Sequence, residues 1–153
     1  MIILLGILYV TAILAIILYL NAQGSFMTDN MGKLILRIMV GGLMLFHGVS
    51  KLQHGIGYIK GLVVGQGLPE FLAYGVYVGE LVAPVLLILG WRSRIWAGVI
   101  AVNMLVVIYL TQLGAFMKLG AHGSWAVELQ MFYLLSALAI AFMGSGKFAI
   151  TED

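Results

Sequence analysis

Five long apolar runs constrain the fold of this chain more than any other feature of its sequence. Each is close to the roughly 20 residues that a helix needs to cross the hydrocarbon core of a bilayer. The runs are Ile2–Leu20, Leu34–Lys51, Phe71–Leu89, Ile95–Gln112 and Ala126–Met143. They are continuously apolar and do not alternate as the strands of a membrane barrel do, so they indicate helices. The sequence therefore predicts an all-α, polytopic membrane helical bundle.

The composition agrees with an integral membrane protein. Of the 153 residues, 63% are hydrophobic and only 9% are charged, whereas a soluble domain carries about 25% charged residues. The net charge of +2 comes from scattered side chains, which gives no support for nucleic-acid binding. The chain has no cysteine, and this excludes thiolate metal sites, iron–sulfur ligation and thiol–disulfide chemistry by the chain itself.

The first apolar run is unusual because it contains no charged residue and has no basic flank. We therefore divide the chain into an extra N-terminal transmembrane helix with its linker, residues 1–26, and a four-helix membrane domain, residues 27–153. We expect the first helix to be retained and to pack at the periphery. A signal anchor and a small membrane peptide joined to the rest are alternatives. A cleaved signal peptide is disfavoured because no basic segment precedes the run.

The basic residues predict the orientation, because positive charge in short loops favours the cytoplasmic side. If the first run starts outside, five basic residues lie at the inner face: Lys33, Arg37, Arg92, Arg94 and Lys147. Three lie at the outer face: Lys51, Lys60 and Lys118. This bias predicts a multi-pass protein with its N-terminus outside and its C-terminus in the cytoplasm. We expect it to lie in a bacterial-type plasma (inner) membrane.

Ionisable side chains within or beside the apolar runs indicate a polar interior. A charge in hydrocarbon costs roughly 3 kcal/mol or more, so each must find a partner or water. His47 and Lys51 are four residues apart and share one face of a helix. We expect one outward-opening cavity lined by His47, Lys51, Glu80 and Glu128. Arg37 is expected to pair elsewhere or with Glu80.

Each of these residues has a functional and a structural interpretation. His47 could transfer protons or donate a hydrogen bond to a quinone-like carbonyl, or it could simply be satisfied by a carboxylate or a backbone carbonyl. Glu80 could relay protons, or it could form half of a buried pair with Arg37 or Lys51 that fixes helix packing. Glu128 could join the site or cap its own helix.

We take His47, Glu80 and Glu128 as the candidate catalytic residues. The candidate cofactor-binding residues are Arg37, His47, Lys51 and Asn103. No metal site is predicted, because His47, His54 and His122 do not have the spacing of a metal-binding motif.

The segment between the second and third runs, residues 52–69, is too rich in glycine to span a membrane. It is expected to form a short interfacial helix or a lid over the cavity, and its glycines favour mobility. Gly75 and Gly79 are expected to let helices approach closely. Pro84 is expected to kink the third helix or to release a carbonyl there.

Short motifs follow one another in a fixed order over residues 33–150. They are Leu36–Gly42 with its Arg37, His47-Gly48-Val49-Ser50-Lys51-Leu52, Gly67-Leu68-Pro69, Gly79-Glu80-Leu81, Leu89–Arg94, Trp125 with Glu128, and Gly144-Ser145-Gly146-Lys147-Phe148. In this order and spacing they resemble the DoxX family of small four-helix membrane proteins. The first apolar run lies outside the resemblance.

The resemblance implies a fold more firmly than a reaction. The family name comes from a membrane subunit associated with thiosulfate:quinone oxidoreductase, and distant relatives act in assembly. One interpretation is therefore a membrane subunit of a quinone-linked redox system with a polar intramembrane cavity and a quinone as its cofactor. It would need a partner that carries the electron-transfer cofactor. The alternative is a non-catalytic assembly or stabilising subunit that acts through lateral contacts with other membrane proteins, redox proteins or a second copy of the chain in the lipid bilayer.

Overall fold

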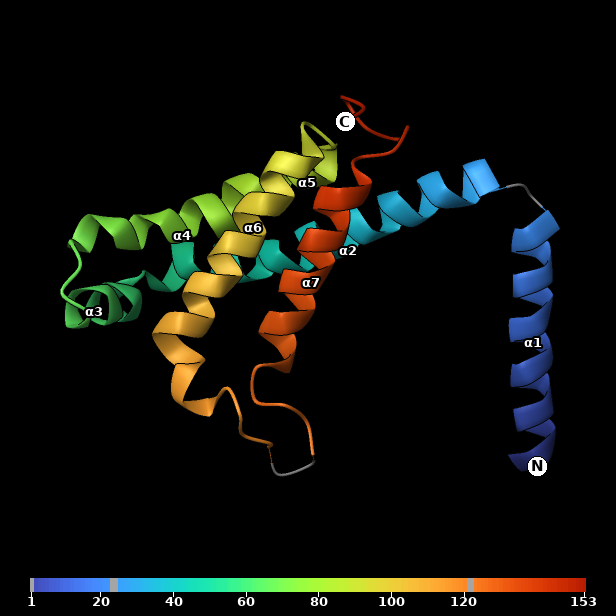
Figure 1. Cartoon of the computed structure of the whole chain (residues 1–153), viewed down its shortest axis with the longest axis horizontal. Coiled ribbons are helices and arrows are strands. Elements are labelled where there is room, and N and C mark those ends of the chain that lie inside the picture. Colours follow the sequence, from blue (N-terminus) through green and yellow to red (C-terminus); the bar gives the residue numbers. More distant parts are fainter. Residues whose placement is uncertain (1, 23–24, 121–122) are drawn as a thin grey trace.

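The computed structural model describes residues 2–22, 25–120 and 123–153, and its regular structure is helical (Figure 1). The α-helices are α1 (Ile2–Ala22), α2 (Ser25–His54), α3 (Gly57–Gly65), α4 (Gly75–Tyr77), α5 (Ala83–Leu89), α6 (Ser93–Val107) and α7 (Glu128–Met143). An isolated antiparallel bridge joins Leu119 to Trp125 in the loop before α7. The predicted all-α fold is confirmed.

Two of the helical rods change their winding along their length. The third apolar run is helical from Glu70 to Leu89, with a 3₁₀ segment (Glu70–Tyr74), α4, a π-helical segment (Val78–Val82) and α5 in succession. The fourth continues from α6 through a second π-helical segment (Ile108–Gln112) into a 3₁₀ turn (Leu113–Ala115). Single π-helical turns occur frequently at functional sites.

The helix boundaries agree with the apolar runs except at α2, which begins at Ser25 and not near Leu34. The early part of α2 is polar, and a helix can continue beyond the hydrocarbon because its hydrogen bonds are internal. The segment of residues 52–69 contains a short helix, α3. A short helix was expected if this segment lies at the membrane interface.

Within the described residues, three helical rods are long and apolar enough to cross a membrane: Thr28–His54, Glu70–Leu89 and Ser93–Ala115. Two shorter apolar stretches, Thr11–Leu20 and Glu128–Met143, accompany them. These apolar helices agree with a multi-pass membrane protein. The number of spans and the orientation of the termini stay predictions.

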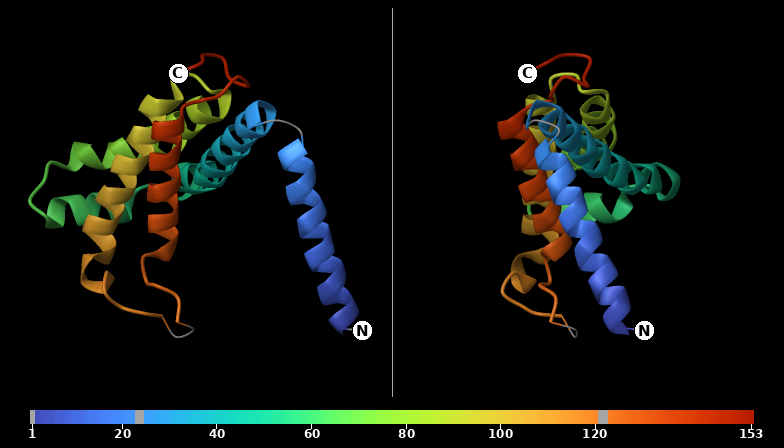
Figure 2. Two further views of the ribbon diagram at one scale, coloured as in Figure 1. Left: turned by 45° about the vertical axis from the view of Figure 1, so that its right-hand side comes forward. Right: turned by 90° about the vertical axis from the view of Figure 1, so that its right-hand side faces the viewer.

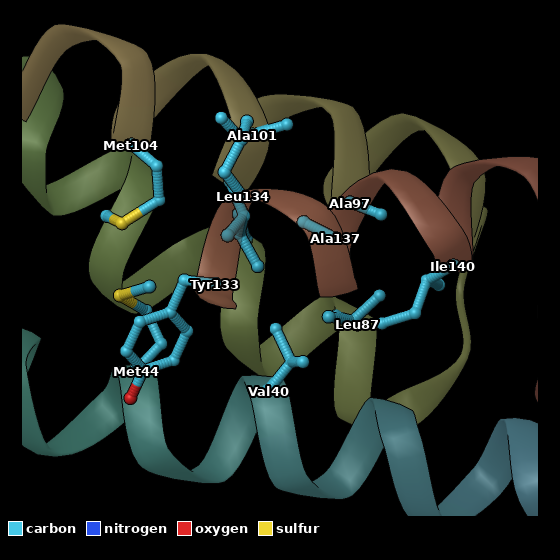
Figure 3. Close-up of a cluster of buried hydrophobic side chains, with 12 residues drawn as sticks. Val40, Met44, Leu87, Ala97, Ala101, Met104, Tyr133, Leu134, Ala137 and Ile140 are labelled. Carbon is cyan, nitrogen blue, oxygen red and sulfur yellow. The ribbon is translucent and has the colours of Figure 1, made fainter. Parts of the chain in front are cut away.

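The core lies where α6 and α7 pack side by side across α2 and α5 (Figures 1 and 2). Small residues line the contact between α6 and α7, and Ala97 and Ala137 are fully buried, so the two backbones approach closely. Figure 3 shows Val40 of α2 and Leu87 of α5 beneath this pair, with Tyr133 and Met44 at one end of the cluster.

Helix α1 stands apart from the bundle in Figure 1 and in the left view of Figure 2. Its described side chains are exposed, among them Leu14, Ile17 and Leu18. The helix is peripheral, as expected, but its described side chains are exposed and do not pack against the bundle. The division of the chain at residue 26 stays a prediction.

Candidate functional site

A cavity of about 600 Å³ lies between the end of α2, α3, the rod that leads into α5, the second half of α6 and the start of α7. Most of its lining is aliphatic. The polar or ionisable side chains that line it are His47, Lys51, Tyr58, Glu80, Asn103, Thr111, Gln130 and Tyr133. An apolar chamber with a few convergent polar groups is the usual form of a small-molecule site.

An ion pair between α2 and the π-helical segment lies at this cavity. Lys51 Nζ is 2.5 Å from Glu80 Oε2, and the side chains of Lys51 and Glu80 are 25% and 4% exposed, respectively. The prediction that Glu80 contacts a basic residue of the second apolar run is confirmed, with Lys51 as the partner. Removing one member of such a pair strands a buried charge, so the pair strongly constrains the packing of the two helices.

Local backbone chemistry explains why Glu80 sits opposite Lys51. Pro84 has no N–H, so it cannot donate the α-helical hydrogen bond to the carbonyl of Glu80 four residues earlier. The π-helical segment Val78–Val82 lies at this point. A Cβ added at Gly48 would overlap this Glu80 carbonyl oxygen. Glycine therefore lets α2 come close enough for Lys51 to reach the carboxylate.

His47 and Tyr133 bring an imidazole and a phenol together at the cavity. Their ring centroids are 6.1 Å apart at an interplanar angle of 88°, the edge-to-face arrangement that aromatic pairs favour. Tyr133 is 5% exposed, while His47 is exposed. The imidazole is thus oriented by the phenol and accessible to a ligand.

Asn103 also lines the cavity, as its mid-helix position in the fourth run suggested. Its amide packs against the π-helical segment, because a Cβ added at Gly79 would lie 2.5 Å from Asn103 Cγ. The expected close approach is therefore confirmed at Gly79, but it is wrong at Gly75, where an added Cβ would meet nothing within 4 Å.

Glu128 does not lie at the cavity, and its expected position there is wrong. Its side chain is exposed, and its Oε2 accepts a hydrogen bond from the backbone N–H of Trp125 at 3.3 Å. Glu128 is the first residue of α7, and this contact ties its side chain to the loop before the helix. It is not an N-cap of α7, because the N-cap residue is Val127 and no side chain caps the helix, so the capping interpretation of Glu128 is not observed.

Helix α7 contributes Gln130 and Tyr133 to the cavity lining in place of the expected Glu128. They are three residues apart and share one face of α7. Glu128 is two residues before Gln130, so it points to a different side of the helix. The spacing of Gln130, Tyr133 and the small residue Ala137 could have identified this face from the sequence, because residues three and four apart share one side of a helix.

Arg37 is also away from the cavity, ten residues or about 15 Å along α2 from His47. It is 1% exposed and does not line the cavity, whereas the other candidate cofactor-binding residues, His47, Lys51 and Asn103, do. Its guanidinium donates to the carbonyls of Leu87 (3.0 Å) and Ile88 (2.8 Å) in the last turn of α5. It also donates to the carbonyls of Ser145 (2.6 Å) and Phe148 (3.0 Å). Of its two expected placements, pairing elsewhere is the one observed.

The segment after α7 wraps around this buried arginine and the start of α6. Asp153 accepts hydrogen bonds from the backbone N–H groups of Arg94 and Ser145, both at 2.9 Å. Partial burial would by itself raise the pKa of the Asp153 carboxyl, but these hydrogen bonds and the charge of Arg94 lower it below its ordinary value. The motif Gly144–Phe148 therefore fastens the C-terminal segment and does not face the cavity.

Within residues 2–22, 25–120 and 123–153, no cluster of three or more His, Cys, Asp or Glu side chains could hold a metal ion. His54 is hydrogen-bonded to its own helix, 2.9 Å from the carbonyl of Ser50. His122 lies outside the described residues.

Comparison with known proteins agrees with the motifs that surround the cavity. A family model described as DoxX matches residues 32–113, more than half of the chain, and this range contains His47, Lys51, Glu80 and Asn103. The chain belongs to the DoxX family.

One curated relative of this DoxX-family chain is a Bacillus subtilis (strain 168) protein named "Putative oxidoreductase CatD". The two are 33% identical over 123 residues, which cover 79% of this chain and 85% of the relative. No solved structure matches the chain significantly.

Proposed function

We propose that this DoxX-family protein is a membrane component of a quinone-linked redox system, and that it binds the quinone in the cavity between α2, α3, α6 and α7. The observation that carries the proposal is the Lys51–Glu80 pair, with its carboxylate 4% exposed, at a largely aliphatic cavity that also holds His47 and Tyr133. The oxidoreductase name of the B. subtilis relative supports the same class of function.

The shape of the cavity suits this ligand class. A volume of about 600 Å³ is in the range of small-molecule sites and holds one substituted ring. The aliphatic walls, including Ile59, Val76 and Leu110, bury an apolar ring or tail. The polar groups at the α2 side then face the ring oxygens.

The chemistry assigned to these residues is proton exchange. Reduction of a quinone to a hydroquinone takes up two electrons and two protons. The electrons come from a redox partner protein that carries its own cofactor. His47 donates a proton to a ligand oxygen, since imidazole exchanges protons near neutral pH. The adjacent Lys51–Glu80 pair can then supply the proton that replaces the one lost by His47.

The exposed apolar surface of α1 favours a second candidate, a non-catalytic assembly or stabilising subunit. Leu8 and Leu18 are each 66% exposed, and helix α1 stands clear of the bundle that contains the cavity (Figure 2). In this case α1 would contact a neighbouring membrane protein, and the Lys51–Glu80 pair would serve only the packing of the bundle.

Binding of a soluble quinone separates the two candidates. Duroquinone should bind to the full chain in nanodiscs, and lipid extracts of the purified protein should contain a quinone. Glu80→Gln and His47→Gln should each weaken duroquinone binding about ten-fold, the loss of about one hydrogen bond to the ligand or its supporting pair. The matched control is Glu128→Gln, a carboxylate outside the cavity, which should bind normally. Absence of any duroquinone binding by the wild-type chain would contradict the proposal and favour the assembly role.

A further inference from the structure

Two carboxamide side chains at the cavity carry polar atoms whose hydrogen-bonding capacity is unused. Asn103 Nδ2 on α6 and Gln130 Oε1 on α7 are buried and have no partner among the residues that the structure describes. Both side chains line the same cavity. Helices α6 and α7 pack side by side (Figure 1), so the two amides reach the cavity from neighbouring helices.

Leaving such atoms without partners is unfavourable. A buried donor or acceptor without a partner is destabilising, and native proteins contain few of them. An aliphatic side chain would avoid this cost at either position. The cavity is the space from which a ligand can supply the missing partners.

The Asn103 amide is held in place by the backbone. A Cβ added at Gly79 would lie 2.7 Å from Asn103 Oδ1, so the oxygen side of the amide packs against the π-helical segment. The Nδ2 group is the part left for another contact. Gln130 lies one turn before Tyr133 on α7, on the face that lines the cavity.

The two unused atoms have opposite hydrogen-bonding character. Asn103 Nδ2 can only donate, and Gln130 Oε1 can only accept. The carbonyl oxygens of an oxidised quinone accept but cannot donate. The hydroxyl groups of a hydroquinone do both, so the hydroquinone satisfies both amides and the quinone satisfies Asn103 alone.

We propose that Asn103 and Gln130 select the oxidation state of the ligand, and that the cavity binds the hydroquinone form in preference to the quinone. This inference rests on the proposed function, because it assumes a ligand of the quinone class. Asn103 Nδ2 donates a hydrogen bond to a ligand oxygen in either form, and Gln130 Oε1 discriminates by accepting a hydrogen bond from a hydroquinone hydroxyl. Preferential binding of the reduced form raises the midpoint potential of the bound couple, by about 30 mV for each factor of ten in affinity.

The test compares durohydroquinone with duroquinone on the wild-type full chain in nanodiscs without oxygen. Durohydroquinone should bind about ten-fold more tightly, the effect of one hydrogen bond to an otherwise unpaired acceptor. A redox titration of the bound couple should show the matching rise in midpoint potential. Neither measurement depends on a variant that folds.

Variants at the two positions and one control then assign the effect to these residues. Gln130→Leu should remove the preference by weakening durohydroquinone alone, and Gln130→Met serves if the leucine variant does not fold. Asn103→Leu should weaken both forms about equally. The matched control is Gln112→Leu, which removes an amide from the π-helical segment Ile108–Gln112 at a position that does not line the cavity, and it should leave both affinities unchanged.

The outcomes distinguish this inference from the proposed function. If both forms bind equally, or if duroquinone binds more tightly, the inference is overturned while quinone binding stands. A preference that survives in Gln130→Leu also overturns it. If neither form binds to the wild-type chain, the inference and the proposed function fail together.

Discussion

Lys51 Nζ lies 2.5 Å from Glu80 Oε2, where the last turn of α2 meets the π-helical segment Val78–Val82. This contact joins α2 to the helical rod of residues 70–89 at the cavity. It also depends on the glycine at position 48, because a Cβ added there would overlap the Glu80 carbonyl oxygen.

Glu80→Ala should destabilise the protein by about 3 kcal/mol or more, because it leaves the Lys51 ammonium without its carboxylate partner. Glu80→Gln should cost less, since the amide oxygen still accepts a hydrogen bond. Reversible unfolding in detergent with increasing SDS measures both variants. Glu128→Ala is the control, and a loss as large as that of Glu80→Ala would contradict the assigned roles.

Gly48→Ala should destabilise the contact between α2 and the π-helical segment by about 1–3 kcal/mol, because the added methyl group overlaps the Glu80 carbonyl. Gly42→Ala, in the same helix, meets nothing within 4 Å and should be neutral or stabilising by up to about 1 kcal/mol. The same SDS unfolding assay compares them. Equal effects of the two substitutions would show that the helices are not in close contact at Gly48.

Arg37→Ala should release the segment after α7, because four carbonyl groups lose their common donor. Arg37→Lys should rescue only part of the effect, since an ammonium cannot reproduce the planar fork of a guanidinium. Limited proteolysis should cut the variants first between Ser145 and Asp153. Ligand binding at the cavity should survive in Arg37→Lys, because Arg37 does not line it.

The hydrogen bonds to Asp153 predict a pH effect. They lower the pKa of this carboxyl below its ordinary value near 4, so its contribution to stability is present above that value. The contribution is lost as the pH falls through the lowered pKa of the folded state. Asp153→Asn should therefore be less stable than wild type at pH 7, and the difference should shrink below pH 4. Glu152→Gln, a neighbouring exposed side chain, is the control and should show no such convergence.

The topology prediction can be tested with single cysteines, because the chain has none. In intact cells, Lys118→Cys should react with a membrane-impermeant maleimide and Glu152→Cys should not. Permeabilised cells provide the control, since both variants should then react. Labelling of Glu152→Cys in intact cells would reverse the predicted orientation.

Several features followed from the sequence because they depend on local chemistry. A continuous apolar run predicts a helix whatever packs against it. The predicted helix boundaries therefore agree with the structure within a few residues, except at the polar start of α2. The family was evident from motifs whose order is a property of the chain. The contact of Glu80 with a basic group followed from energetics, because a carboxylate within an apolar helix needs a partner.

Only the tertiary structure decided which residues meet. The rotation of α7 about its own axis turns Gln130 and Tyr133 toward the cavity and Glu128 away, and packing against α2 and α6 sets that rotation. The partners of Arg37 at Ser145 and Phe148 come from the far end of the chain, so no local pattern could identify them. The sequence alone determined the class of fold and the need for buried partners. The choice of Lys51 for Glu80, and of backbone carbonyls for Arg37, depended on close approaches such as Gly48 to Glu80, which exist only once the helices are packed.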